Sequence, residues 1–190
     1  MSRWEANARG RLQQAALELY SERGFEATTV AEIARRAGLT QRTFFRHFVD
    51  KREVLFSGED PLHELLVLAV AGAPESGSPL KTFAAGLKPA VAMFFASRPR
   101  EQARLRQEVI AVNEALQERE LIKLSRLSTA VAAALRGRGM AEPAATLTAE
   151  TGVVIFKIAV ERWITDTADR DIANHIDALV NELTALAGGS

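Results

Sequence analysis

The fold is decided by residues 24–51, which read GFEATTVAEIARRAGLTQRTFFRHFVDK. Within this stretch, Thr29 and Glu32 form a capping box, in which the threonine hydroxyl caps a helix start and the glutamate reaches back to it. Gly38 is expected to end that helix, and Thr40 to cap a short second helix. Two helices joined by a glycine turn in this way can present the second helix to the major groove of DNA.

The rest of the chain is also predicted to be helical, because apolar residues recur with the helical period and no window sustains the alternation of a strand. Pro61 is expected to interrupt the chain, and residues 73–79 form the clearest loop. Asp50 is expected to cap a short helix, with Glu53 three residues further on. Besides the helix after Thr29, the predicted helices cover about residues 5–23, 41–47, 50–56, 62–72, 80–97, 100–111, 114–136, 143–167 and 170–187. The sequence therefore predicts an all-α fold.

The charge distribution suggests two domains. Net charge is zero over the 190 residues, which by itself argues against a nucleic-acid binder. Residues 1–56, however, hold 10 Lys/Arg and 7 Asp/Glu, a net charge of +3, whereas residues 57–190 hold 14 and 17, a net charge of −3. We predict an N-terminal three-helix DNA-binding domain over residues 1–56, with a helix-turn-helix at about residues 29–48, and a C-terminal helical domain over residues 57–190.

Composition narrows the possible chemistry. The chain has no cysteine, so disulfides, thiolate metal sites and a cysteine nucleophile are excluded. Its histidines, His47, His63 and His175, have no metal-ligand spacing. The N-terminus lacks a signal-peptide pattern, and the longest apolar stretch, residues 65–73, is far shorter than the roughly 20 residues of a membrane span. We expect a cytoplasmic protein with no metal, no cofactor and no membrane partner.

The start of the second short helix has side chains suited to reading bases. Arg42 can pair with guanine through two hydrogen bonds, Gln41 can pair with adenine, and the methyl groups of Thr40 and Thr43 can touch the thymine methyl. A capped helix, glycine turn and second helix also occur in many helical proteins without DNA-binding function. Its three phenylalanines can belong to a core, and two of them, four positions apart, are expected to do so: Phe44 and Phe48.

Residues 29–51, with the approach over residues 15–20 and 24–29, resemble the signature of the TetR family of transcriptional regulators. The resemblance covers about residues 10–56 and implies a DNA-binding domain followed by a domain that dimerises and binds a small molecule. Thr28, Thr29 and Lys51 stand near helix starts, where backbone amides favour a phosphate. The full set of expected DNA contacts is Thr28, Thr29, Arg36, Thr40, Gln41, Arg42, Thr43, Phe45, His47 and Lys51.

Two of these positions need comment. The family usually has tyrosine where this chain has Phe45, and that phenol typically donates a hydrogen bond to a DNA phosphate. Phe45 cannot donate, so one backbone contact is expected to be weakened or replaced. His47 follows the family pattern, where a phosphate contact is expected, but a lone histidine can equally cap or pack.

The last two predicted helices indicate a dimer. The final helix has one apolar stripe, and the helix before it is apolar on more than one side, so it must be buried on several sides. A four-helix interface between two subunits would bury it and matches the dimer that the resemblance implies; a central helix of a monomer is the alternative. The expected interface residues are Val154, Ile155, Ile158, Ile176, Leu179, Val180 and Leu183. A two-fold dimer would read a palindromic operator.

The expected effector is hydrophobic or amphipathic, because the candidate pocket residues are mostly apolar. They are Met93, Phe94, Val109, Val112, Asn113, Leu116, Leu127, Val131, Phe156 and Trp163. Each of these can instead be plain core. Polar residues within apolar stretches, namely Asn113, Lys157, Glu161 and Arg162, can orient a ligand or simply be exposed or paired. Effector binding is expected to move the DNA-binding helices through residues 50–72. The resemblance to the TetR family favours repression over activation.

Two other classes of protein fit the sequence less well than a regulator does. An enzyme is disfavoured because the chain has no glycine-rich phosphate loop, nucleophile motif or zinc-binding helix. Asp166, Asp169 and Asp171 resemble a helix end and cap more than a metal cluster. A helical carrier or interaction protein would share the apolar C-terminal core but would not need Thr40–Thr43 at the start of a recognition helix.

Overall fold

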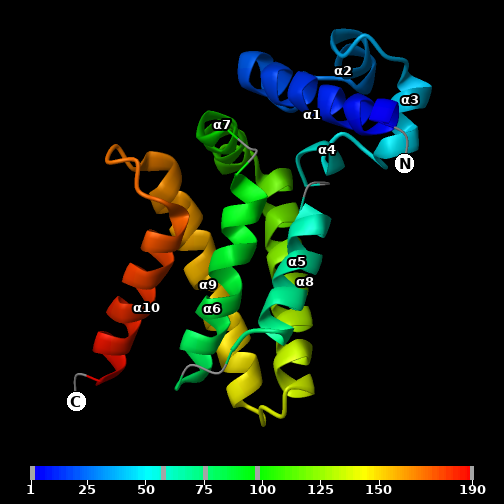
Figure 1. The fold of residues 1–190 in the computed structure, drawn as a ribbon. Helices are drawn as coiled ribbons and strands as arrows, with labels where there is room; N and C mark the ends of the chain where they lie inside the picture. Colours follow the sequence, from blue (N-terminus) through cyan, green and yellow to red (C-terminus); the bar gives the residue numbers. More distant parts are fainter. Residues whose placement is uncertain (1–2, 57–58, 75–76, 97–98, 189–190) are drawn as a thin grey trace. The chain divides into compact units, whose positions relative to one another are not determined.

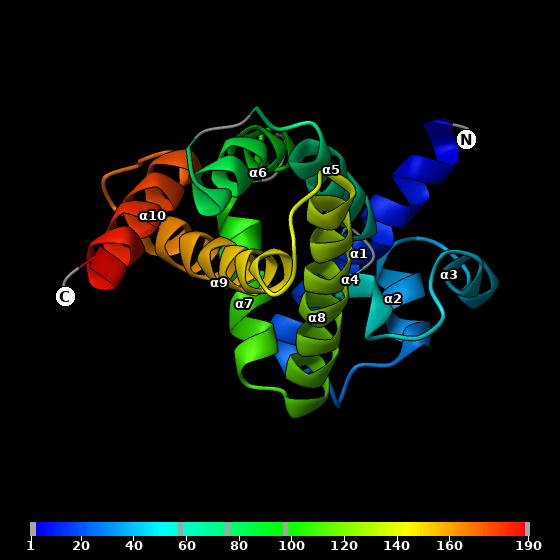
Figure 2. The same ribbon diagram turned by 90° about the horizontal axis from the view of Figure 1, so that it is seen from below.

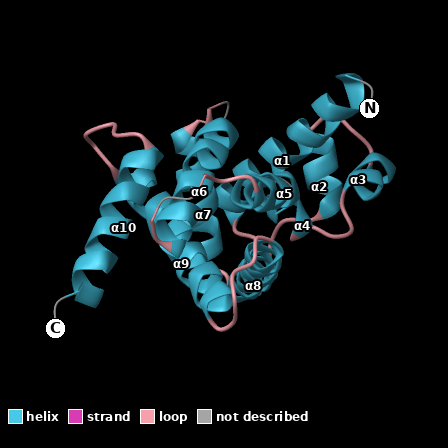
Figure 3. Ribbon diagram, turned by 60° about the horizontal axis from the view of Figure 1, so that its bottom comes forward, coloured by secondary structure: helices cyan, strands magenta, loops and turns pink. Residues whose placement is uncertain are grey.

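The structure is a computed structural model that describes residues 3–56, 59–74, 77–96 and 99–188. Within these ranges all regular structure is helical (Figures 1 and 3), which confirms the predicted all-α fold. The helices are α1 (Arg3–Arg23), α2 (Val30–Arg36), α3 (Gln41–His47), α4 (Glu53–Phe56), α5 (Glu59–Ala71), α6 (Pro79–Phe95), α7 (Arg100–Ala111), α8 (Glu114–Gly137), α9 (Ala144–Thr165) and α10 (Ile172–Gly188).

The chain forms two compact units. Unit 1 is built from residues 1–60 and 102–120, and unit 2 from residues 61–101 and 121–190. Unit 1 therefore contains residues 102–120, which the predicted boundary after residue 56 assigns to the second domain. That boundary remains a prediction for where the DNA-binding domain ends in the sequence.

Unit 1 has one apolar core, to which α1, α2, α3 and α4 all contribute. Its fully buried side chains include Leu12 of α1, Ile33 of α2, Phe44 of α3 and Phe56 of α4. Phe48 is buried in the same core, so the prediction that Phe44 and Phe48 are core residues is confirmed. This packing fixes the position of α3 from its buried side and leaves its other side to solvent.

Residues 102–120 complete unit 1 from the end of α7 and the start of α8. Val109, Ile110 and Leu116 lie in the same apolar cluster as the α1–α4 core. The guanidinium of Arg106 donates to the carbonyl oxygen of Leu55 at 3.1 Å and lies 5.1 Å from the Phe56 ring centroid. Burial of apolar surface by this segment thus contributes to the stability of unit 1.

Unit 2 is organised around α6, α9 and α10, which pack side by side (Figures 1 and 2). Two glycines allow close approach. A Cβ on Gly86 of α6 would lie 2.7 Å from the Ala69 carbonyl oxygen, and a Cβ on Gly152 of α9 would lie 2.5 Å from the Phe83 ring. Unit 2 therefore depends on small residues at its helix contacts.

One difference from the predicted elements is at Pro61. The helix expected to start near residue 62 begins at Glu59, so Pro61 lies in the first turn of α5 rather than before it. Proline is tolerated there because the amides of the first turn have no partner within the helix. None of the described helices combines the length and apolar content needed to cross a bilayer.

Candidate nucleic-acid interface

The start of α2 is fixed by the predicted capping box. The Thr29 hydroxyl accepts from the Glu32 amide at 3.3 Å, and the Glu32 carboxylate accepts from the Thr29 amide at 2.9 Å. The amide and the hydroxyl of Thr29 both donate to the Glu32 carboxylate, and this lowers the pKa of Glu32 below its ordinary value. The reciprocal bonds satisfy amides that the first turn of a helix otherwise leaves unpaired.

The turn between α2 and α3 requires glycine. Gly38 has φ of +64°, a left-handed conformation that side chains disfavour. A Cβ at this position would also lie 2.7 Å from Nη2 of Arg11, whose guanidinium donates to the Ala37 carbonyl oxygen. The Leu39 amide donates to the Ala34 carbonyl at 2.8 Å and closes the end of α2. The geometry of this turn sets the angle at which α3 leaves α2.

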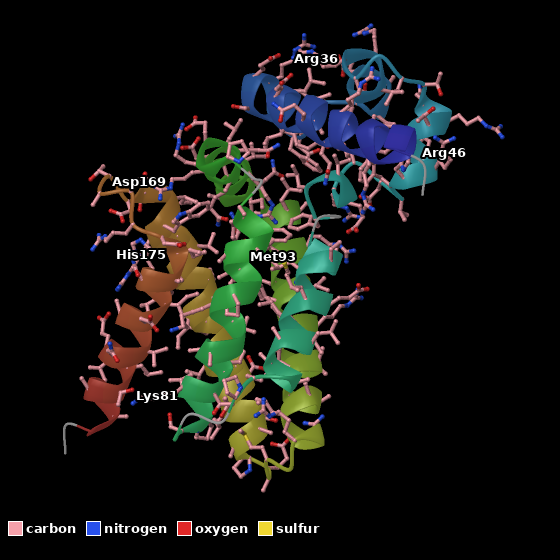
Figure 4. All side chains as sticks on the ribbon, viewed as in Figure 1. Arg36, Arg46, Lys81, Met93, Asp169 and His175 are labelled. Atoms are coloured by element: carbon pink, nitrogen blue, oxygen red, sulfur yellow. The ribbon has the colours of Figure 1, made fainter. Side chains whose placement is uncertain are left out.

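The outer face of α3 carries polar and cationic side chains together with the Phe45 ring, and it has no carboxylate. The Thr40 hydroxyl caps the helix by accepting from the Thr43 amide at 3.1 Å, as predicted. Gln41, Arg42 and Arg46 are exposed, and Arg46 projects from α3 in Figure 4. Within the described part of the chain, the guanidinium groups of Arg42 and Arg46 form no ion pair. These cations are therefore available to a polyanion.

Two predicted phosphate contacts instead hold the turn between α1 and α2. Thr28 is 1% exposed, and its hydroxyl donates to the Gly24 carbonyl oxygen at 2.8 Å. We therefore leave the Thr28 side chain out of the proposed interface. Lys51 donates from Nζ to the carbonyls of Phe25 at 2.9 Å and Thr28 at 3.1 Å, and lies 4.3 Å from the Phe25 ring centroid. The Tyr20 hydroxyl donates to the Lys51 carbonyl oxygen at 2.6 Å.

Arg36 and His47 also have intramolecular neighbours. Nη2 of Arg36 lies 2.8 Å from Oε2 of Glu22, and Nη1 lies 3.4 Å from Oε2 of Glu18. The pKa of Glu22 falls because Arg36 donates a hydrogen bond to its carboxylate. The His47 ring is half-buried, with its centroid 6.2 Å from that of Phe48. Arg36 must exchange these carboxylates for a phosphate if it contacts DNA.

Known proteins match this part of the chain. Residues 12–57 match the family model described as bacterial regulatory proteins of the tetR family. The HTH-type transcriptional regulator TcmR of Streptomyces glaucescens is 35% identical over 80 residues, an alignment that covers 42% of this chain and 35% of that protein. Residues 12–57 of the chain therefore form a DNA-binding domain of the TetR-family type, and the alignment spans about a third of the length of TcmR.

Solved structures extend the likeness in fold to nearly the whole chain. NalD, the secondary repressor of the MexAB-OprM multidrug efflux pump in Pseudomonas aeruginosa, has a TM-score of 0.63 at 18% identity, covering 95% of this chain and 96% of that chain. FadR of Thermus thermophilus, a TetR-family transcriptional repressor in complex with lauroyl-CoA, has a TM-score of 0.55 at 24% identity, covering 93% of each chain. The TetR architecture of a helix-turn-helix domain followed by a helical domain therefore applies here.

The residues predicted for the effector pocket do not form one set. Val109, Val112, Asn113 and Leu116 belong to unit 1, where Leu116 is fully buried in the core. Val112 is 83% exposed and lines an open groove of about 250 Å³ with Val109 and Asn113. Six lie in unit 2: Met93, Phe94, Leu127, Val131, Phe156 and Trp163. Of these, Met93 is exposed on α6 (Figure 4) and Leu127, Val131, Phe156 and Trp163 are buried.

The predicted dimer residues also divide. Four are buried within the single chain: Ile155, Ile176, Leu179 and Val180. Val154 is 53% exposed, and Ile158 and Leu183 are half-buried. Val154, Ile158 and Leu183 therefore keep exposed surface on α9 and α10, whereas the other four are buried within the single chain.

The sequence pattern did not predict that five polar side chains are buried among the described residues of unit 2. They are Thr82, Lys123, Ser128, Thr148 and His175. The polar residues that the sequence suggested are elsewhere: Lys157 and Arg162 are exposed, and Arg162 lies 3.3 Å from Glu182. A usable signal existed at Lys123, which stands four residues before Leu127 and eight before Val131, on one apolar helix face.

Asp166 and Asp169 make side-chain contacts at the α9–α10 turn. Asp166 follows α9, and its carboxylate accepts from the amide of Ala168 at 3.0 Å and from Nε of Arg170 at 2.8 Å. Asp169 has φ of +53° and lies 3.1 Å from Arg100. Across the described ranges, no group of His, Asp and Glu side chains is arranged to hold a metal ion.

Proposed function

We propose that the chain is a sequence-specific DNA-binding transcriptional regulator that reads its operator with α3. The observation that carries the proposal is the exposed face of α3, on which Gln41, Arg42 and Arg46 are available while Phe44 and Phe48 anchor the opposite face in the core. The match of residues 12–57 to the TetR-family model supports it.

The roles of the residues follow from base and phosphate chemistry. Arg42 would donate to O6 and N7 of a guanine, and Gln41 would pair with an adenine. Thr29, Arg36, Thr40, Thr43 and His47 would position the helix through phosphates and sugar, which fix register without reading sequence. Arg46, which the sequence reading did not include, joins the proposed phosphate contacts because its guanidinium is free.

The regulator would act as a homodimer on a palindromic operator. A two-fold dimer places two reading heads on half-sites one helical turn, or a multiple of it, apart. The outward side of α9 and α10, with Val154, Ile158 and Leu183, is the proposed interface. A strictly monomeric protein in sedimentation at micromolar concentration would remove this part of the proposal.

The effector would be a hydrophobic or amphipathic small molecule bound in unit 2. The FadR relative was solved with lauroyl-CoA, an amphipathic ligand, which makes acyl-CoA a sensible first probe. The buried polar side chains of Thr82, Ser128 and Thr148 are proposed to orient the ligand's polar end. Both structural relatives are named as repressors, so we propose repression relieved by the effector. The effector can shift the equilibrium between the DNA-bound and free states only by as much as its affinities for the two states differ.

The test is a selection of bound sequences from random duplex DNA, with purified protein at about 150 mM salt. Enrichment of one palindrome would support a dimeric sequence-specific regulator and supply the probe for effector screening. If nothing is enriched, the selection is repeated with protein denatured and refolded without ligand, which removes any effector retained during purification. A folded, ligand-free protein that still selects no sequence would refute the proposed function.

A further inference from the structure

Phe45 is an exposed aromatic residue on the face of α3 that is proposed to meet DNA. It is 57% exposed, and Val49, four residues on, is 85% exposed. The apolar core does not need this ring, because Phe44 and Phe48 already fill that position at 0% and 3% exposure. An edge contact with the Phe44 ring, with centroids 5.4 Å apart and planes at 82°, supports the Phe45 ring from below.

The ring lies near the middle of the exposed face of α3. At about 100° per residue, Phe45 is about 40° from Gln41 and about 60° from Arg42 around the helix axis. The exposed side chains of α3 run from Gln41 through Phe45 and Arg42 to Arg46. A partner that approaches this face to be bound by the two arginines must therefore also meet the phenyl ring.

The chemistry of the ring selects the part of DNA that it can contact. A phenyl group has no hydrogen-bond donor and cannot replace the phosphate contact of a tyrosine. The major groove offers one apolar group, the C5 methyl of thymine, and an apolar side chain in contact with it discriminates thymine from the other bases. Lone exposed apolar residues are common on protein surfaces, but this one lies between Gln41 and Arg42, and the face has no carboxylate that would repel DNA.

We propose that Phe45 is a specificity-determining residue whose ring contacts the 5-methyl group of one thymine in each operator half-site. This inference rests on the proposed function and assigns one base that Arg42 and Gln41 do not read. The thymine would neighbour the base pair bound by Arg42, because the two side chains are adjacent on the helix face.

The experiment uses the duplex enriched by the selection and replaces each thymine in turn with deoxyuridine, which lacks only the methyl group. For the wild-type protein, one replacement per half-site is expected to weaken binding about fourfold, the effect of one buried methyl group. Phe45→Ala should bind the thymine duplex more weakly and lose the response to that replacement, while responses elsewhere persist. Val49→Ala serves as the matched control and should keep the response.

Other outcomes separate the two claims. Equal responses to deoxyuridine in the wild type and Phe45→Ala would overturn the assignment of Phe45 while the selected palindrome still supports the regulator. A loss in Phe45→Ala that is the same on all sequences would indicate a sugar or phosphate contact and would also overturn it. Loss of self-association in Phe45→Ala, with unchanged DNA binding, would identify the ring as a protein contact instead. A protein that selects no duplex would remove both claims.

Discussion

The two compact units differ in where they place polar side chains. In unit 1 they lie at helix ends and bond to backbone: Thr29 and Thr40 cap α2 and α3, and Thr28 and Lys51 bond to carbonyls of the α1–α2 turn. In unit 2 polar groups also enter the interior, and the main helices approach closely where a side chain is absent, as at Gly86 and Gly152.

This difference bears on function as well as stability. The core of unit 1 buries one side of α3 and leaves the other side exposed, and that exposed side is the proposed DNA contact. Burying a polar group costs free energy unless it is hydrogen-bonded. The interior of unit 2 includes the buried side chains of Thr82, Ser128 and Thr148, which are the groups proposed above to orient the effector.

The largest effect on stability is expected where two helices of unit 2 approach so closely that there is no room for a side chain. Gly86→Ala would place a Cβ 2.7 Å from the Ala69 carbonyl oxygen and 2.9 Å from Cα of Val70, so backbone must move. We expect a loss of about 3 kcal/mol in the free energy of unfolding, measured by chemical denaturation. Gly10→Ala in α1, with open space at the Cβ position, is the control and should stabilise by about 0.5–1 kcal/mol. Equal effects of the two substitutions would contradict the shape-dependence of unit 2.

The next effect tests the surface function of unit 1. Arg42→Ala should cost about 1–3 kcal/mol of binding free energy on the selected operator and relax the preference at one base pair. Stability should not change, because Arg42 is exposed and unpaired. Arg162→Ala in unit 2, which removes an exposed pair with Glu182, should leave operator affinity unaltered. Binding isotherms on the operator and its single-base variants would decide, and a uniform loss on all duplexes would reject base reading by Arg42.

A substitution at Lys51 distinguishes a structural role of this side chain from a contact with a DNA phosphate. Lys51→Met removes bonds to the carbonyls of Phe25 and Thr28 and should lower the free energy of unfolding by about 1–2 kcal/mol. A phosphate contact would in addition reduce the slope of log affinity against log salt by about 0.9. We expect that reduction for the control Arg46→Met, with no loss of stability, and not for Lys51→Met. A lower slope for Lys51→Met would restore the phosphate contact that the sequence suggested.

The helices of unit 1 within residues 1–56 could be predicted closely because their structure depends on local chemistry, whereas the addition of residues 102–120 was not predicted. The capping box of Thr29 and Glu32, the cap at Thr40 and the core positions of Phe44 and Phe48 all follow from spacing within one or two turns. The bonds of Lys51 to Phe25 and Thr28, which lie more than 20 residues away in the chain, do not follow from such spacing, and its phosphate contact stays a prediction. Such long-range bonds leave no periodic signal in the sequence.

Unit 2 could be predicted only to the level of its helices. The bounds of α7 were predicted correctly. The sequence did not show which apolar side chains of a helix fill the core, line a pocket or face a second subunit. Ile155 and Val154 are neighbours in the chain, yet one is buried and the other exposed. Core, pocket and dimer faces all require apolar residues at helical spacing, so the tertiary packing alone distinguishes them. The pocket and dimer assignments therefore stay predictions.

The smallest effect on stability is expected at Asp166. Like the polar side chains at the helix ends of unit 1, this residue of unit 2 bonds to nearby backbone and side-chain groups. Its side chain is 5% exposed and lies 3.1 Å from Nε2 of His175 (Figure 4 labels His175 near this turn). The Arg170 guanidinium, and then the amide of Ala168, lower the pKa of Asp166 well below its ordinary value. A carboxylate with a lowered pKa in the folded state stabilises the fold above its unfolded pKa of about 4 and loses this contribution as pH falls through the folded value.

Asp166→Asn should therefore destabilise the protein at neutral pH, and the difference from wild type should shrink as pH falls below about 4. The control Asp177→Asn removes a carboxylate that meets Lys88 at an exposed position, where ion pairs contribute at most about 1 kcal/mol. Denaturation curves across the range from about pH 7 to about pH 3 would measure both differences. A difference for Asp166→Asn that stays constant down to the lowest pH would mean that Asp166 acts through its shape and neutral hydrogen bonds. The turn after α9 would then be held, like the rest of unit 2, by packing rather than by charge.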